Sequence, residues 1–126
     1  MQHDAEVIPY LNSFVQDAAT HGREAEVKER LASVSVVLVD SFDTPDVIGR
    51  CSLSTLEDKV EFLRSHFKRQ SHYRRMSLVY HELGHCVLGI TEHTQGKLSI
   101  MNSPYIAGHL FALFEQALLL ELFRPE

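Results

Sequence analysis

Hydrophobic residues recur at helical spacing between Ala5 and His21. They are Val7, Leu11, Phe14, Val15 and Ala18. On a helix this spacing places them along one face, and Gly22 is well suited to end the helix. We therefore expect an N-terminal helix that packs on the core of the protein. The charged stretch 23–33 that follows fits either a second helix or a loop that leads into the core.

Three short strand patterns come next. Ser33–Phe42 is dense in β-branched residues, which predicts a strand buried on both faces. Segments 46–54 and 59–67 are two further strand candidates, separated by a polar stretch. The 59–67 segment separates its polar and apolar residues poorly between two faces, so we expect it to be an edge strand.

The sequence pattern in the second half of the chain predicts two helices. Ser71 is a suitable N-cap for a helix that runs to about Leu88, and Gly89 is a suitable left-handed C-cap. Ser103 and Pro104 favour the start of the last helix, because the missing N–H of proline costs nothing in a first turn.

The whole pattern predicts an α+β fold in one domain over residues 1–126, with a small mixed sheet, an N-terminal packing helix, a central helix and a C-terminal helix. A chain of 126 residues with 44% hydrophobic residues is large enough for one core without a disulfide framework. The apolar run from Phe111 to Phe123 is interrupted by charged residues and is too short to span a bilayer, so it predicts a buried helix.

Charge and the N-terminal sequence narrow the partners. A formal net charge of −5 argues against a general nucleic-acid binder, which needs a positive excess, and favours a peptide or protein. The N-terminal segment lacks the basic and apolar regions of a signal peptide, so export would require a signal upstream of this chain. The sequence leaves the oligomeric state open.

His81, Glu82 and His85 form the pattern His-Glu-x-x-His within the expected central helix. Residues four apart on a helix are neighbours, so His81 and His85 can present ring nitrogens to one metal ion. Glu82 lies about 100° further round the helix, where it can take a proton from a water molecule but not easily bind the same ion. Metal-assisted hydrolysis needs this division of roles. The alternative is an amphipathic helix with half-exposed histidines.

The residues after the helix extend this pattern. Gly89 lets the chain turn back, and His93 follows within four residues, where it can meet the first two histidines. Met101 lies eight residues beyond His93 in the sequence Ser-Ile-Met. A methionine in a tight turn can form an apolar floor beneath a metal site, although it can equally be an ordinary core residue.

The order His-Glu-x-x-His, glycine, third histidine and Ser-Ile-Met resembles the zinc-binding motif and Met-turn of the metzincin metallopeptidases. It also resembles small bacterial metzincin-like proteins in which a Gly-x-Cys strand precedes the active-site helix, as Gly49 to Cys51 does here. The resemblance is strongest from His81 to Met101 and looser from Val34 to Phe123. The chain departs from the usual metzincin spacing, because the glycine comes one residue late and the third histidine two residues late.

The resemblance implies a zincin-like fold that holds one Zn²⁺ per chain at His81, His85 and His93, with Glu82 as general base. It also implies a substrate that lies extended along the edge strand of the sheet. We therefore predict a zinc-dependent endopeptidase that hydrolyses peptide bonds by a Glu-assisted, zinc-bound water. The alternative is a catalytically silent zinc-binding fold that binds a peptide or a partner protein.

Three residues compete for the third ligand position. We predict His93, because a loop can absorb two extra residues at little cost and a third neutral ligand keeps the pull of the ion on its water strong. Glu92 is the nearest alternative, since a slip of one residue would present its carboxylate. Glu115 is the other, because one class of zincins takes its third ligand from a later helix.

Other side chains have two interpretations each. Tyr105 can hydrogen-bond a tetrahedral oxyanion, as a tyrosine does in some metzincins at a different offset, or it can pack against the sheet. Cys51 and Cys86 can form one bridge that joins the strand to the active-site helix, or remain two free thiols. Arg74 and Arg75 oppose the helix dipole in the first helical turn, which predicts some local partner.

Overall fold

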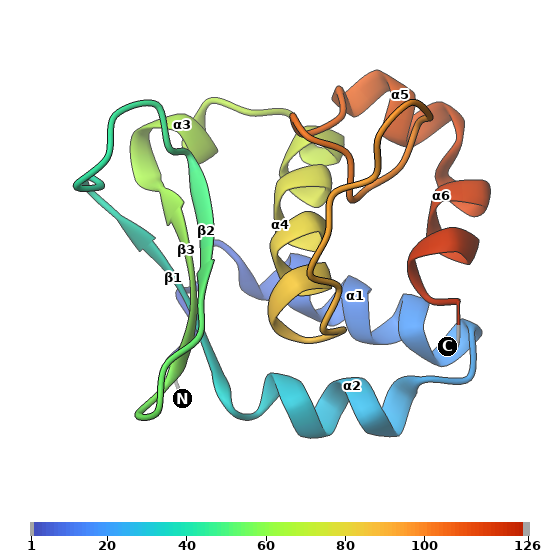
Figure 1. Cartoon of the computed structure of the whole chain (residues 1–126), viewed down its shortest axis with the longest axis horizontal. Helices are drawn as coiled ribbons and strands as arrows, with labels where there is room; N and C mark the ends of the chain where they lie inside the picture. Colours follow the sequence, from blue (N-terminus) through green and yellow to red (C-terminus); the bar gives the residue numbers. More distant parts are fainter. Residues whose placement is uncertain (1, 125–126) are drawn as a thin grey trace.

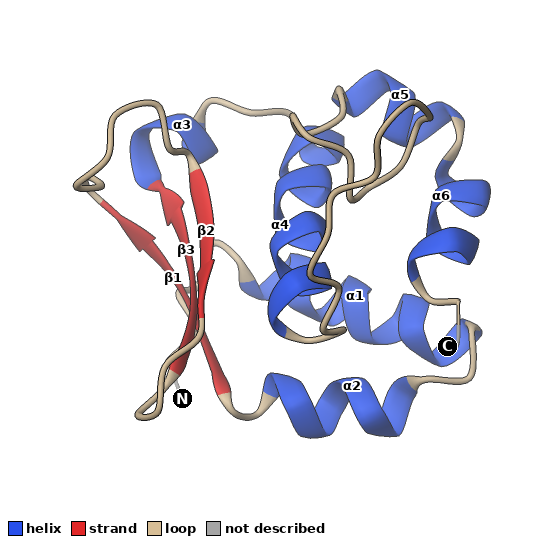
Figure 2. Ribbon diagram, in the orientation of Figure 1, coloured by secondary structure: helices blue, strands red, loops and turns tan. Residues whose placement is uncertain are grey.

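Helix α4 is the central element of the fold, and a small sheet lies to one side of it (Figures 1 and 2). The structure is a computed structural model that describes residues 2–124. In chain order, its elements are α1 (Ile8–Thr20), α2 (Glu24–Leu31), β1 (Val34–Val39), β2 (Gly49–Ser52), β3 (Asp58–Leu63), α3 (Arg64–Lys68), α4 (His72–Cys86), α5 (Gly108–Leu113) and α6 (Glu115–Leu122). The fold is therefore α+β, as predicted.

The residues of α4 from Met76 to Gly84 are all buried, because β2, β3, α1 and α5 contact this helix from different sides. The predicted N-cap is confirmed, whereas the helix ends at Cys86 with Val87 as its C-cap, so Gly89 is left-handed as predicted but lies two residues beyond the cap. The Ser71 hydroxyl accepts a hydrogen bond from the Arg74 N–H at 3.3 Å, and Gly89 has a φ of 72°. The caps limit the helix, and burial of its middle holds it rigidly against the sheet.

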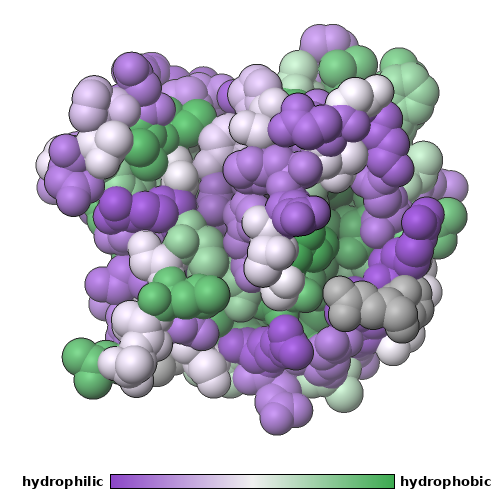
Figure 3. All heavy atoms as spheres, viewed as in Figure 1, coloured by the Kyte–Doolittle hydropathy of each residue, from purple (hydrophilic) through white to green (hydrophobic). Residues whose placement is uncertain are grey.

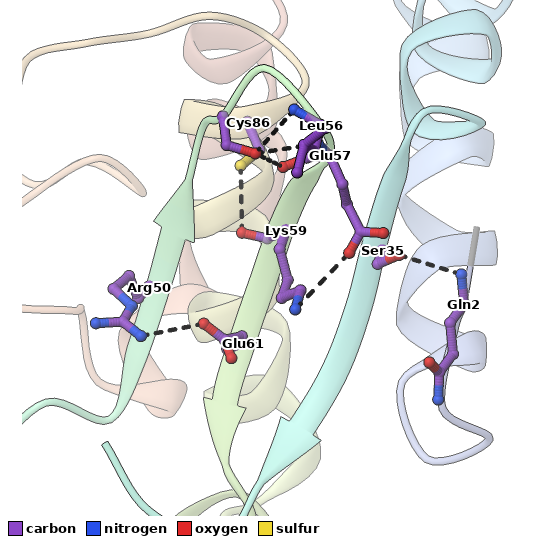
Figure 4. Close-up of polar contacts among 9 residues, drawn as sticks. Gln2, Ser35, Arg50, Leu56, Glu57, Lys59, Glu61 and Cys86 are labelled. Carbon is purple, nitrogen blue, oxygen red and sulfur yellow. Dashed lines mark hydrogen bonds and ion pairs between the residues drawn. The ribbon is translucent and has the colours of Figure 1, made fainter. Parts of the chain in front are cut away.

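The sheet has the strand order β1-β3-β2, with β1 parallel and β2 antiparallel to β3. The prediction that segment 59–67 is an edge strand is wrong, because β3 is the central strand. Its Val60 and Phe62 side chains are fully buried, while Glu61 pairs across the sheet with Arg50 at 3.2 Å (Figure 4). Neutralisation of Glu61 by a cross-strand arginine lets a central strand carry polar residues on one face.

The first part of the chain agrees with the remaining expectations. The N-terminal helix forms as α1, and Gly22 has a φ of 74° after its end. Of the two structures expected for the charged stretch 23–33, a helix or a loop, the helix is observed. This helix, α2, buries Val27 and Leu31. Strand β1 buries most of its side chains, as expected.

The last helical region begins later than predicted. Ser103 and Pro104 lie in the loop before α5, which starts at Gly108. The guanidinium of Arg74 donates hydrogen bonds to the carbonyl oxygens of Tyr105 (3.0 Å) and Ile106 (2.8 Å). These carbonyl groups are therefore bound to α4 and do not take part in a helical turn of their own. These bonds also identify the local partner expected for Arg74.

Two further expectations need correction. The segment 59–67 is not a strand throughout, because the chain changes from β3 to the short helix α3 at Arg64. The run from Phe111 to Phe123 is divided into α5 and α6 near Phe114, and it is not uniformly buried, since Leu113 and Leu120 are 72% and 61% exposed. Among the described residues, no helix is both long and apolar enough to cross a membrane.

Candidate metal centre

His81 and His85 project from the last turns of α4, and both rings are oriented by main-chain carbonyl groups. The Nδ1–H of His81 donates to Ile100 O at 2.8 Å, and that of His85 donates to Ile90 O at 2.6 Å. With a proton on Nδ1, each Nε2 atom carries the lone pair and is the potential ligand atom. Burial is the main reason that the pKa of His81 falls to about 4, so its ring is neutral at pH 7.

His93 meets these two histidines from the loop that follows α4. Its Nε2 atom lies 3.2 Å from Nε2 of His85, and one ring nitrogen from each of the three histidines falls within 4.8 Å of the others. Two imidazole nitrogens that bind one tetrahedral zinc are about 3.3 Å apart. The spacing of His85 and His93 therefore fits a shared ion, and the cluster is the only such group of His, Cys, Asp or Glu side chains in residues 2–124.

The loop brings His93 back to α4 because it is anchored on both sides. The Ile90 N–H donates to Gly84 O at 2.9 Å, and the Thr94 N–H donates to Met101 O at 3.0 Å. Thr91 and Glu92, between these anchors, are exposed to solvent. His93, which follows them, is exposed as well. Figure 1 shows this segment, in orange, running back along α4.

The two competing carboxylates lie outside the histidine cluster. Glu92 is exposed on the outer part of the loop. Glu115 is in the first turn of α6 and lines a groove with Asp17 of α1 and with His21, which follows that helix. In this arrangement the third nitrogen comes from His93. Ligation itself stays a prediction.

Glu82 is 4% exposed and lies beside the histidines on α4. Burial raises the pKa of its carboxyl group, and hydrogen bonds from the Tyr105 hydroxyl and from the main chain of Cys51 offset only part of this increase. Glu82 is therefore held between the helix, strand β2 and Tyr105. A carboxylate with a raised pKa is better matched to proton transfer near neutral pH than an ordinary one.

Tyr105 reaches into the site from the loop before α5. Its hydroxyl contacts the Glu82 carboxylate and lies 3.2 Å from the carbonyl oxygen of Gly49, and its ring lies 4.7 Å from that of His81, centroid to centroid. Burial and the nearby Glu82 charge raise the pKa of the phenol, so it remains a proton donor. The predicted role of Tyr105 toward an oxyanion stays a prediction.

Strand β2 is fixed beside α4 by a covalent bond and by a close contact. Cys51 and Cys86 form a disulfide with their Cα atoms 5.7 Å apart, which settles the pairing that the sequence left open. A Cβ atom at Gly49 would lie only 2.8 Å from the Tyr105 hydroxyl oxygen, so this position requires glycine. The Gly-x-Cys pattern therefore has two structural reasons, a close approach and a cross-link.

Met101 lies directly beneath α4, in the turn that also supplies the carbonyl oxygen bound to His81. The Asn102 N–H donates to Ser99 O at 3.1 Å and closes this turn. Met101 is 3% exposed, and its Sδ atom would lie 2.3 Å from a Cβ atom at Gly84. The methionine thus packs against the bare backbone of α4 between the two helical histidines, as an apolar floor would.

These residues surround an open cleft of about 490 Å³. It is lined by Gly49, Arg50, Cys51 and Leu53 from the region of β2, by His81, Glu82 and His85 from α4, by Ile90, Thr91 and His93 from the next loop, and by Asn102, Ser103, Pro104 and Tyr105. All five predicted site residues are among them. Sequence reasoning missed Leu53, Ile90 and Asn102, since no motif distinguishes a side chain that lines a cleft through loop geometry.

In comparisons with known proteins, no family model, no curated protein and no solved structure matches this chain.

Proposed function

We propose that this chain is a zinc metallopeptidase of metzincin type, in which His81, His85 and His93 hold one Zn²⁺. The observation that supports this most strongly is the convergence of three imidazole nitrogens, within 4.8 Å, beside the buried carboxylate of Glu82. Three neutral nitrogen ligands leave an open coordination position, the arrangement found in catalytic zinc sites. When bound, zinc would act as a Lewis acid that lowers the pKa of water from about 15.7 to about 7.

The residues of the chain would divide the remaining work. The carbonyl oxygens of Ile90 and Ile100 hold the rings of His85 and His81, which keeps their Nε2 atoms directed toward a common point. Glu82 accepts a proton from water and returns it to the leaving amine. The single O–H of Tyr105 holds the Glu82 carboxylate in place, and it would donate to a developing oxyanion only after Glu82 has taken up a proton and released the hydroxyl.

The edge of the sheet offers a place for an extended substrate. Because the Leu63 N–H donates to Ile48 O, the antiparallel register turns the main-chain groups of Arg50 and Ser52 toward β3. Those of Gly49 and Cys51 face away from β3, on the cleft side, where Tyr105 contacts Gly49 O and Glu82 contacts the Cys51 main chain, so an added strand would pair at the end of β2, beyond these two residues. A peptide can add to such an edge as a further strand, held by main-chain hydrogen bonds.

The test compares Glu82→Gln with Glu92→Gln, a control that removes an exposed carboxylate from the neighbouring loop. Zinc content is measured by metal analysis, and hydrolysis by mass spectrometry of a mixed peptide library. We expect Glu82→Gln to retain zinc and lose on the order of 10² to 10⁴ in rate, because the general base is removed. The control should behave like the wild type.

Two outcomes would contradict the proposal. If Glu82→Gln cleaves peptides as fast as the wild type, the general base is assigned wrongly. If the zinc-loaded wild type cleaves no peptide in the library, the enzyme assignment fails and the alternative gains support, namely a silent zinc fold that binds a peptide or partner protein.

A further inference from the structure

The turn between β2 and β3 exposes two leucines beside the cleft. Leu53 is 68% exposed and Leu56 is 94% exposed. Figure 3 shows hydrophobic surface at the tip of this hairpin, which lies at the lower left in Figure 1. Single exposed leucines are common on protein surfaces, so what distinguishes this pair is the place of Leu53 in the cleft.

The turn that carries them is ordered. The Ser54 hydroxyl donates to Glu57 O at 2.6 Å and accepts hydrogen bonds from the N–H groups of Leu56 (3.3 Å) and Glu57 (3.0 Å). One side chain therefore holds the main chain of the whole turn. The leucines are presented in a defined position without any burial to hold them there.

The two leucines differ in their relation to the cleft. Leu53 lines the cleft together with His85 and with Ile90 from the loop after α4, whereas Leu56 does not line it. Leu53 and His85 also line an adjoining hollow of about 430 Å³, so the accessible surface continues past them. An apolar wall thus stands next to the histidine cluster, at the end of the cleft where β2 leaves the sheet.

The charged side chains that line the cleft itself are already paired, whereas the adjoining hollow past Leu53 also holds Glu29, Arg30 and Asp58. Arg50 is the only Lys or Arg among the described residues that line the cleft, and its guanidinium is occupied by Glu61 (3.2 Å) and Asp43 (3.3 Å). Glu82 is the only Asp or Glu there, and it is held by Tyr105. A charged side chain bound between Leu53 and Ile90 would lose its hydration without gaining an opposite charge, which is unfavourable. Removing an aliphatic side chain from water is favourable.

The main chain at Leu53 is open as well. Leu53 follows Ser52, the last residue of β2, and within residues 2–124 neither its N–H nor its carbonyl group has a hydrogen-bond partner. The neighbouring outward groups are already used, because Gly49 O contacts Tyr105 and the Cys51 main chain contacts Glu82. An added peptide strand could therefore pair with β2 at Leu53.

We infer that Leu53 and Ile90 form an apolar subsite that selects an aliphatic side chain of an extended peptide bound along β2. This inference rests on the proposed function, since it names the substrate class of the same cleft. The peptide main chain pairs at Leu53, and its aliphatic side chain lies between Leu53 and Ile90 beside His85.

The experiment compares Leu53→Asn with Leu56→Asn, which makes the same chemical change in the same turn outside the cleft. Both leucines are exposed, so neither variant should lose its fold. In a peptide library, the wild type should prefer Leu, Ile, Val or Met at one position. Leu53→Asn should lose that preference by about 10-fold or more in kcat/KM, the effect of an aliphatic group in a pocket. Leu56→Asn should keep it, and both variants should bind zinc like the wild type.

The inference is overturned if Leu53→Asn keeps the wild-type preference, or if Leu56→Asn loses it equally. Binding measurements separate this result from failure of the proposed function. Zinc-loaded Glu82→Gln is titrated with acetyl-Ala-Leu-Ala-amide and with acetyl-Ala-Asn-Ala-amide while NMR follows the methyl groups of Leu53 and Ile90. Selective shifts with the leucine peptide support the subsite even if the wild type cleaves nothing. No selective shift contradicts the subsite, even if the wild type is an active peptidase.

Discussion

The Nε2 atoms of His85 and His93 lie 3.2 Å apart, although the first residue belongs to helix α4 and the second to the loop beyond its end. Two unprotonated imidazole nitrogens repel each other at this distance unless a proton or a cation lies between them. The positive φ of Gly89 and the anchored Ile90 produce this approach. The distance therefore fits a hydrogen bond in which the Nε2–H of His93 donates to His85, or a cation that both nitrogens bind.

Removal of metal should destabilise the protein. An ion that binds only the folded state stabilises it by about 2.7 kcal/mol when its free concentration is 100 times Kd. For a chain of 126 residues, this corresponds to a fall in Tm on the order of 10 °C in excess chelator. Calorimetry with and without added zinc, together with metal analysis, checks this expectation. Protein that contains no zinc and melts at the same temperature in chelator would contradict it.

The Cys51–Cys86 disulfide should contribute strongly to stability, because it closes a loop with a sequence separation of 35. Loop-closure entropy for this length gives about 3 to 4 kcal/mol. The double variant Cys51→Ser/Cys86→Ser should lose about that much free energy of unfolding in urea denaturation. Addition of a reducing agent should have the same effect on the wild type and none on the variant. A double variant as stable as the wild type would show that the cross-link does not stabilise the fold.

Gly84→Ala should destabilise the protein despite the better helix propensity of alanine. The propensity gain is about 1 kcal/mol, whereas the new Cβ atom would lie 2.3 Å from the buried Met101 Sδ atom and force that side chain to move. Overpacking of this kind costs about 1 to 3 kcal/mol. The effect should shrink in a Met101→Ala background, where the clash is absent. If Gly84→Ala raises the free energy of unfolding, the packing of Met101 beneath α4 is described wrongly.

Local signals in the sequence predicted the elements that local interactions decide. Helix α4 follows from the hydroxyl of Ser71 at one end and the left-handed Gly89 shortly beyond the other. The meeting of His81 and His85 follows from helical spacing alone. The approach of His93 was also expected, because a short loop after a glycine restricts where the next residues can go.

Other features depend on contacts between distant residues, which no local pattern reveals. The position of β3 in the centre of the sheet depends on its pairing with both β1 and β2, which lie elsewhere in the sequence, and Glu61 meets Arg50 only once β2 is in place. The late start of α5 accompanies hydrogen bonds from Arg74 to the chain beyond Pro104, and proline is favoured both in turns and in first helical turns.

The identity of the third ligand tests the proposed centre most directly. Zinc affinity is measured by competition with a chromophoric chelator for His93→Ala, Glu92→Ala and Glu115→Ala. We predict that His93→Ala alone loses affinity, by more than the roughly 10- to 100-fold that loss of an outer-shell partner costs, because it removes a nitrogen that faces His85. If His93→Ala binds zinc like the wild type while either glutamate variant does not, the three-histidine centre is contradicted.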